Sequence, residues 1–329
     1  MNSLAMIAGT LCVALAPFVP VKAVTFAENF STEPTPHGWG VFGNTNLFHW
    51  DSTNQNLRVT WDSSQTNSYF HHPLGTVLTS DDDFSLSFDL NFSDYVSGTN
   101  PGKPYAFQAA LGFLNLAQAT QTNFSRGAGT SAAYGPNNLV EFNFFPAFST
   151  YLPTIGQVIV STNNVWLYNH DPDNLLDMTP GQTFRVTMNY AAASRTLATT
   201  VTNNGTQYGP TQLITVPTNF DFRVSSFSIS SYSDQRADGS ILARGTVDNI
   251  MITVPPPPVM NFTGAFSNAV WRTQFLSRTN WLYMLERAAS FTGWTEASPT
   301  SPGTGTMLSL ADTNPPWAKS FYRIRAERP

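Results

Sequence analysis

Residues 84–92, FSLSFDLNF, alternate strictly between large apolar and small polar side chains. Every second residue is Phe or Leu, and Ser, Asp or Asn stands between them. Successive side chains of a β-strand point to opposite faces, so this alternation predicts a strand with one face in a core and the other toward water. The segment indicates an antiparallel sheet with one buried side.

The same period of two recurs along the chain. TFRVTMNY (183–190) and residues 197–201 repeat it, and AAASR (191–195) between them predicts a hairpin turn. Further strand-like segments are NLVEFNFF, VSSFSISSYS and TVDNIMITV. Clusters of Asn, Gly and Pro, such as SGTNPGKP and DPDN, separate the segments and are typical of turns.

The large number of short strand-like segments predicts an all-β fold. At least about ten of them within residues 24–254 favour a two-sheet antiparallel jelly-roll sandwich. One segment leaves its structure open: FQAALGFLNLAQATQ (107–121) fits either a short helix or a pair of fully buried strands.

Four prolines, at 255–258, follow the last of these strands. Proline donates no hydrogen bond to a sheet and favours polyproline II, so residues 255–260 are predicted to be a stiff linker. Residues 261–329 then supply four short strand candidates, NAVWRTQFLS, NWLYMLERA, GTMLSLAD and SFYRIRAE. They predict a second, smaller module of β-sandwich type.

The first 23 residues have the features of a secretory signal peptide. An apolar run from residue 4 to residue 21 is followed by Ala23, a small residue suited to cleavage. Cleavage there removes Cys12, the only cysteine, so the mature protein has no disulfide and needs a real apolar core. We therefore expect a secreted protein, extracellular or at the cell surface, with no transmembrane segment in the mature chain.

Charge is sparse and unevenly distributed. Charged residues make up 11% of the chain, as in extracellular β proteins rich in Ser, Thr, Asn and Gly. Residues 24–254 carry 17 acidic and 8 basic side chains, a net charge of −9, whereas residues 255–329 carry 4 and 7, a net charge of +3. The acidic larger domain argues against nucleic acid as a partner.

The strand series of residues 24–254 begins with FAENFSTEP, GWGVFG and FHWD, continues with FSLSFDLNF, FRVTMNY and TLATTV, and closes with VDNIMIT. This series resembles a concanavalin A-like lectin/glucanase domain of a secreted bacterial protein. The resemblance implies a jelly-roll fold more strongly than a function.

The C-terminal region carries the pattern Tyr283-x-Leu285-Glu286-Arg287, Trp294, Asp312 and Phe321-Tyr322-Arg323. This pattern resembles a small β module common on secreted bacterial proteins. The resemblance implies a domain for attachment or stability that carries no known chemistry.

Candidate catalytic carboxylates are few. A glycan hydrolase of this fold would place two or three carboxylates on one strand, but residues 24–254 contain only Glu28, Glu33 and Glu141 and no such run. Glu141, with Asn143, is predicted to point away from the core, as a surface or ligand-binding residue. A polysaccharide lyase would need a Tyr/His pair beside an Arg, which leaves Tyr69, His71 and Arg58 as candidates.

The segment NNVWLYNHDPDN (163–174) suggests a sugar-binding face. If Leu167 faces the core, Trp166, Tyr168 and His170 share the opposite face, where flat aromatic rings suit the apolar faces of sugars. The alternative is an edge strand whose aromatic side chains only pack under a loop or against the second module.

Two acidic loops are candidates for a structural calcium ion. One contains Asp171, Asp173, Asn174 and Asp177, and the other is the Asp run at 81–83. Calcium prefers six to eight oxygen ligands from flexible loops, although such runs also form ordinary turns.

The leading hypothesis is a secreted, non-catalytic protein that binds a polysaccharide or another cell-surface glycan through Trp166, Tyr168, His170, Glu141 and Asn143. A glycan-cleaving enzyme, either a glycoside hydrolase or a polysaccharide lyase, is one alternative. A purely structural extracellular protein is another.

Overall fold

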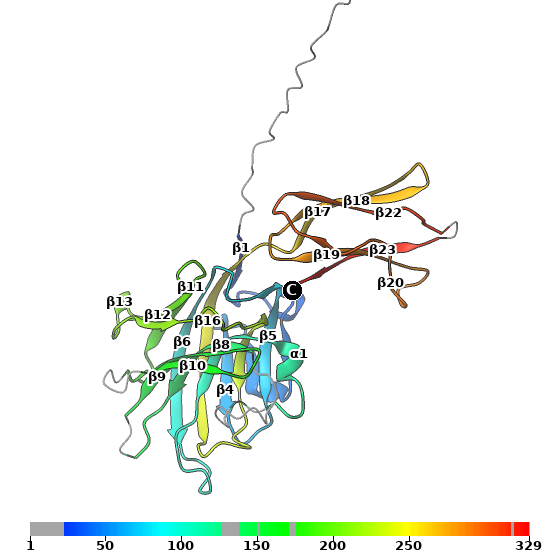
Figure 1. Ribbon diagram of the computed structural model, residues 1–329. Helices are drawn as coiled ribbons and strands as arrows, with labels where there is room; N and C mark the ends of the chain where they lie inside the picture. The colour runs from blue at the N-terminus through cyan, green and yellow to red at the C-terminus, as the bar shows by residue number, and fades with distance from the viewer. Residues whose placement is uncertain are drawn as a thin grey trace, which may run out of the picture.

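A computed structural model describes residues 23–124, 126, 138–149, 152–170, 176–316 and 319–328. The predicted signal peptide, except Ala23, lies outside these residues. The described chain is almost entirely strand, arranged as a two-sheet sandwich beside a smaller β module (Figure 1). This confirms the all-β jelly-roll prediction. None of the helices in the described chain is long and apolar enough to cross a membrane.

The first sheet of the sandwich has nine antiparallel strands. Its main path runs in the order β13 (Thr206–Gln207), β12 (Thr196–Asn203), β11 (Thr183–Ala191), β6 (Phe84–Ser97), β16 (Ile241–Val254), β4 (Asn56–Asp62) and β3 (Phe48–Asp51). Two further strands lie off this path, β1 (Val24–Glu28) beside β16 and β14 (Gln212–Thr215) beside β12. The hairpin predicted at 191–195 joins β11 to β12 and is confirmed.

The second sheet has seven antiparallel strands. Their order is β10 (Trp166–His170), β9 (Thr154–Val160), β8 (Leu139–Phe145), β7 (Ala109–Leu114), β15 (Val224–Ser231), β5 (Ser68–Leu78) and β2 (Gly40–Phe42). The segment with two possible structures forms the buried strand β7 and then a single helical turn, α1 (Leu116–Ala119). Two 3₁₀ turns, at Thr35–His37 and Thr45–Leu47, complete the sandwich.

Aromatic side chains join the two sheets. Phe84, Phe88 and Phe92 of β6 are buried, as the alternation predicts. The rings of Phe88 and Phe142 meet edge to face at 5.9 Å, and those of Phe92 and Phe144 lie 5.0 Å apart. Such contacts add to the gain from burying apolar surface.

The C-terminal module packs two small sheets around a core of its own. One has the order β17 (Val259–Ser267), β18 (Val270–Ser277) and β22 (Met307–Asp312). In the other, β19 (Leu282–Ala288) is flanked by β20 (Thr295–Glu296), β21 (Ser301–Pro302) and β23 (Phe321–Glu327). All four predicted strands are present. β17 was not predicted, and it begins inside the expected 255–260 linker.

A buried carboxylate ties the module to the sandwich. Asp82, in the turn after β5, is 4% exposed and accepts a hydrogen bond from Arg278 at 2.7 Å and another from Arg328. Both guanidinium groups lie beside the Trp281 ring, at 5.7 and 5.1 Å from its centroid. Arg278 also donates to the carbonyl of Pro256 at 3.0 Å, which fixes the proline linker at the same point.

Replacing Asp82 by Ala should therefore destabilise the protein by about 3–5 kcal/mol, because two buried arginines lose their carboxylate. Urea denaturation followed by tryptophan fluorescence would measure the change. Asp94→Ala is the matched control, since the Asp94–Arg244 pair is about half exposed and should contribute at most about 1 kcal/mol. Equal losses in the two variants would show that Asp82 is an ordinary surface charge.

Two adjacent histidines of β5 point to opposite faces, as successive residues of a strand do. The His72 ring stacks on Phe26 at 4.1 Å, while His71 lies against Gly40. Burial lowers the pKa of both side chains below the usual 6.5. The folded protein thus binds these protons less readily than the unfolded chain does.

The sign of this effect gives a pH prediction. As pH falls through about 6.5, the unfolded chain takes up protons that the folded chain refuses, so the free energy of unfolding should decrease. Denaturation curves between about pH 7.5 and 5.5 should show this decrease in the wild type and a flatter profile in His71→Gln/His72→Gln. An identical slope in both proteins would contradict the assignment.

Candidate functional site

The register of the seven-stranded sheet brings four of the five predicted ligand-binding residues, all except His170, to one face. Glu141 and Asn143 lie on β8, and Trp166, Tyr168 and His170 lie on β10, with β9 between them. Val158 of β9 pairs with Glu141 on one side and with Tyr168 on the other. Gly156 pairs in the same way with Asn143 and His170. This face is the outer one, because the alternate residues of β8 pack between the sheets.

Glu141 is not at the surface, which corrects the expectation from the sequence. Glu141 is 1% exposed and Asn143 is fully buried. Arg126 covers both: its Nε donates to Oε2 of Glu141 at 3.0 Å, and its Nη2 donates to Oδ1 of Asn143 at 3.2 Å. The hydroxyl of Tyr232 donates to the other carboxylate oxygen of Glu141. The two predicted residues therefore hold an arginine over the sheet.

The held arginine stacks on aromatic rings. Its Cζ lies 4.7 Å from the centroid of the Trp166 ring and 5.8 Å from that of Tyr232. A guanidinium over a ring face is attracted by the ring quadrupole, and more strongly where water is excluded. Arg126 is 4% exposed, so its ion pair with Glu141 and its ring contacts act in a desolvated site.

Two buried tyrosines complete this network. Burial, reinforced by the charge of Glu141, raises the pKa of Tyr69 and of Tyr232 well above 10. Both hydroxyls thus stay protonated and can donate. Tyr69 donates to the carbonyl of Ala119 at 3.1 Å, which fixes α1 to this face of the sheet.

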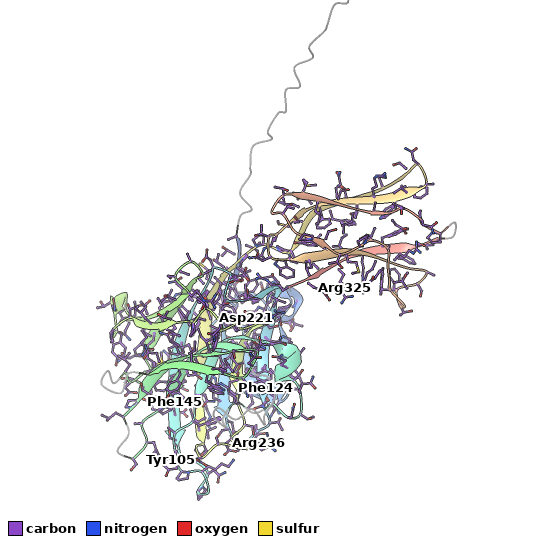
Figure 2. The ribbon with its side chains drawn as sticks, in the orientation of Figure 1. Tyr105, Phe124, Phe145, Asp221, Arg236 and Arg325 are labelled. Atoms are coloured by element: carbon purple, nitrogen blue, oxygen red, sulfur yellow. The ribbon has the colours of Figure 1, made fainter. Side chains whose placement is uncertain are left out.

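A pocket of about 420 Å³ opens beside Arg126 and Trp166. Its walls combine aromatic, amide and backbone groups, from Tyr105, Ala106, Phe107, Gln108, Phe145, Ala237, Asp238 and Gly239. Tyr105 is 52% exposed and lies at the end of the sandwich away from the C-terminal module (Figure 2). We call this hollow the Trp166 pocket.

Backbone contacts fix one wall of the Trp166 pocket. The amide of Tyr105 donates to the carbonyl of Asp238 at 3.2 Å, and the amide of Ser240 donates to the carbonyl of Tyr105 at 2.9 Å. Only glycine fits between them, because a Cβ on Gly239 would lie 2.1 Å from the carbonyl oxygen of Ala106.

Two donors near the pocket lack acceptors within the described part of the chain. They are Nε2 of Gln108, a side chain that is 4% exposed, and the indole Nε1 of Trp166. A buried donor without a partner costs free energy, so each would gain from an acceptor supplied by a ligand. Hydroxyl-rich ligands supply such acceptors.

Sequence reasoning did not identify several residues of this site. Arg126 lies in the Ser- and Gly-rich stretch FSRGAGTSAA, and Tyr105 and Gln108 lie around a proline-rich turn. None of them belongs to an alternating pattern. The one available signal is that Arg126 is among only eight basic residues in residues 24–254.

The remaining predicted residues lie beyond the Trp166 pocket. Tyr168 is 63% exposed near the sheet edge and does not line the pocket. His170 ends β10, and its side chain is not described. The calcium candidates Asp171, Asp173 and Asn174 fall outside the described residues. Asp177 accepts a hydrogen bond from the Tyr95 hydroxyl at 2.5 Å.

The second calcium candidate, the Asp run at 81–83, does not form one site. Asp82 binds two arginines, Asp83 accepts from the amide of Ala192 at 2.8 Å, and Asp81 lies 3.6 Å from Arg195. The three carboxylates diverge because each is taken up by a different protein donor. Across the described ranges, no group of three or more His, Cys, Asp or Glu side chains could hold a metal ion.

The lyase constellation is not assembled either. Tyr69 and His71 belong to β5 of the seven-stranded sheet, whereas Arg58 belongs to β4 of the nine-stranded sheet. The two strands are consecutive in the chain but do not pair with each other, which separates Arg58 from the other two candidates.

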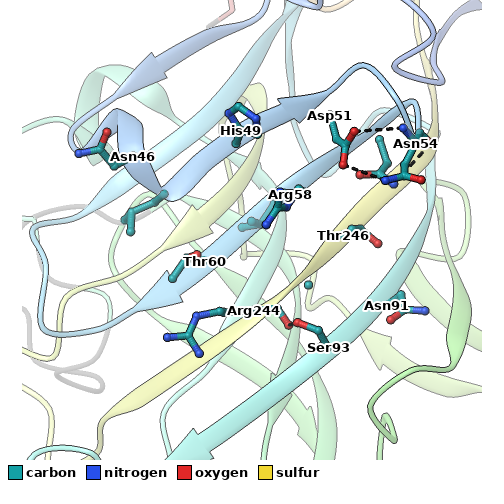
Figure 3. Close-up of a pocket in the computed structure, with 14 residues that line it drawn as sticks. Asn46, His49, Asp51, Asn54, Arg58, Thr60, Asn91, Ser93, Arg244 and Thr246 are labelled. Atoms are coloured by element: carbon teal, nitrogen blue, oxygen red, sulfur yellow. Dashed lines mark hydrogen bonds between the residues drawn. The ribbon is translucent and has the colours of Figure 1, made fainter.

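A second hollow, of about 530 Å³, lies on the outer face of the nine-stranded sheet (Figure 3). A row of polar side chains crosses strands β3, β4, β16 and β6 of this sheet: His49, Arg58, Thr246 and Asn91. The described lining includes no Phe, Tyr or Trp side chain, so this hollow lacks the large aromatic rings on which sugars stack. Its features are those of a solvated polar sheet face.

Solved lectin structures are similar to this chain over about seven-tenths of its length. Peanut lectin with a nine-residue peptide is 17% identical, with a TM-score of 0.42, and the match covers 70% of this chain and 98% of the lectin. Lectin II from Ulex europaeus is 12% identical, with a TM-score of 0.44 and coverages of 71% and 99%. A legume lectin-like domain from Entamoeba histolytica is 12% identical, with a TM-score of 0.40 and coverages of 72% and 98%.

No protein-family model and no curated protein sequence matches the chain. At the identities and TM-scores of the solved lectins, neither a ligand nor a residue role can be transferred to it.

A double-mutant cycle tests the Arg126–Glu141 pair. Glu141→Gln and Arg126→Met should each destabilise the protein by about 3–5 kcal/mol, because each leaves a buried group without its partner. The double variant should lose clearly less than the sum of the two. Urea denaturation measures all four proteins, and additive losses would show that the two side chains are not coupled.

Proposed function

We propose that the protein is a secreted carbohydrate-binding protein that holds a polysaccharide or cell-surface glycan in the Trp166 pocket. The observation that carries this proposal is the combination in one hollow of exposed and half-buried aromatic rings with buried amide and indole donors. Aromatic rings suit the apolar faces of sugars, and the donors suit their hydroxyl oxygens. Few other ligand classes need both at once.

The charges around the pocket favour an uncharged sugar. Arg126 lies in the wall, but its charge is matched by Glu141 at 3.0 Å. Asp238 is a further acidic wall residue. An anionic glycan would thus meet little net positive charge there, and the larger domain is acidic as a whole.

Glu141 supports binding better than catalysis. Both of its carboxylate oxygens are taken, one by Arg126 and one by Tyr232, in a buried position. A general acid or base must reach the proton that it transfers. Glu141 instead keeps Arg126 and Trp166 in place, which preorganises the pocket.

The experiment measures binding and cleavage together. The predicted mature chain, residues 24–329, is incubated with insoluble and soluble neutral polysaccharides, with calcium or with EDTA. We expect depletion from solution without release of sugar. Released sugar would favour the enzyme alternative, and neither depletion nor release would favour a structural protein. The EDTA arm tests whether the acidic loop after β10 contributes a calcium ion.

Substitutions locate the site on the bound polymer. Tyr105→Ala and Trp166→Phe should each weaken binding about tenfold, which corresponds to about 1.4 kcal/mol. Phe291→Ala is the control, because Phe291 is 74% exposed on the C-terminal module. Isothermal titration with soluble oligosaccharides measures the affinities. Unchanged affinity in both pocket variants, with thermal stability retained, would place the binding site elsewhere.

A further inference from the structure

Strand β17 is an open edge of the C-terminal module. It pairs only with β18 in the described chain, and its residues from Asn261 to Ser267 are all exposed. Its sequence, VMNFTGAFS, contains no charge and no proline. Edge strands usually carry charged residues or prolines that prevent pairing with another chain. The edge strand β23, for example, has two arginines and a glutamate.

The exposed apolar side chains of β17 lie on one face. Gly264 is opposite Thr273 and Phe266 is opposite Trp271, and Thr273 is buried, so this face continues the interior side of the module. Phe262 comes two residues before Gly264 and shares its face. Phe262 is 48% exposed and Phe266 is 62% exposed.

The indole of Trp271 lies over Gly264, which is midway between the two phenylalanines along the strand. A Cβ on Gly264 would lie only 2.6 Å from Cζ2 of Trp271, so the glycine lets this ring cover the strand. Trp271 is held from the other side by Tyr322, whose ring is stacked on it at 4.9 Å. Phe262 and Phe266 thus flank the glycine that Trp271 covers, and both side chains are exposed at the open edge.

We propose that β17 pairs with β17 of a second copy of this chain, antiparallel and centred on Gly264. This register places Phe262 of each copy opposite Phe266 of the other, on the same face of a continuous sheet. Cross-strand aromatic pairs of this kind stabilise antiparallel strands. The strand is its own complement because its two phenylalanines stand at equal distances from Gly264.

Neighbouring registers lack this complementarity. Centring the pair on Thr263 places Phe262 opposite Gly264 of the other copy, and centring it on Ala265 places Phe266 opposite Gly264. The register centred on Gly264 also brings no like charges together, since the strand has none. A closed two-fold dimer uses the edge of each copy once, so growth stops at two chains.

The bulge in β17 sets the length of the contact. The pairing with β18 shifts between Met260 and Thr263, where Asn261 takes a φ of 52°. A bulge bends and twists an edge strand away from regular pairing. The dimer contact is thus limited to residues 262–266, which include both phenylalanines.

Charge variants test the dimer in the predicted mature chain. Thr263 of one copy lies opposite Ala265 of the other, so Thr263→Lys/Ala265→Lys places lysines opposite each other twice. Thr263→Glu/Ala265→Glu does the same with glutamates. Sedimentation equilibrium should show a dimer of the wild type at about 100 µM, where an interface with a micromolar Kd is saturated. Each variant alone should be monomeric, and their equimolar mixture should form the dimer again.

A monomeric wild type at this concentration would overturn the proposal, and so would a dimer that persists in both charge variants. A mixture of the two variants that stays monomeric would also overturn it, provided that both variants unfold as cooperatively as the wild type. Phe262→Ser/Phe266→Ser provides a second route, because it removes the rings without adding charge. This variant should weaken the dimer at least about tenfold. An unchanged dimer in this variant would equally contradict pairing through β17.

Discussion

The sandwich depends on a layer of aromatic rings between its two sheets. β6 contributes three phenylalanines to this layer, and β8 of the other sheet contributes two. Without a disulfide in the predicted mature chain, this apolar burial must offset the entropy of ordering a domain of more than 200 residues. The inner faces are therefore committed to packing, and chemistry is left to the outer faces and the loops that cross them.

The outer face of the seven-stranded sheet uses this freedom differently from the nine-stranded sheet. On this face Arg126 covers a carboxylate that would otherwise face water. One ion pair thus converts a polar sheet surface into a buried network with a pocket at its margin. The nine-stranded sheet keeps a row of solvated polar side chains instead.

The alternation of apolar and polar residues made the fold predictable, because a strand with one buried face has an apolar side chain at every second position. The hairpin at 191–195 and the strands of the C-terminal module followed from the same signal. The order of the strands in the sheets could not be predicted from this signal, because no feature of the local sequence indicates that β4 and β5 lie in different sheets. Alternation predicted that Glu141 and Trp166 each point away from the core, but not that their strands lie in one sheet. Nor did it predict the arginine that buries Glu141, because Arg126 comes from a segment with no periodic pattern.

The contact at Asp82 has a mechanical consequence. The polypeptide connects the two folded parts only through the proline linker, yet Arg278 and Arg328 join the module to the loop that leads into β6, a central strand of the larger domain. Tension applied to the module is therefore carried in parallel by the linker and by this side-chain bridge. Under a moderate pull the two parts extend as one body, and the linker bears the load alone only after the bridge has broken.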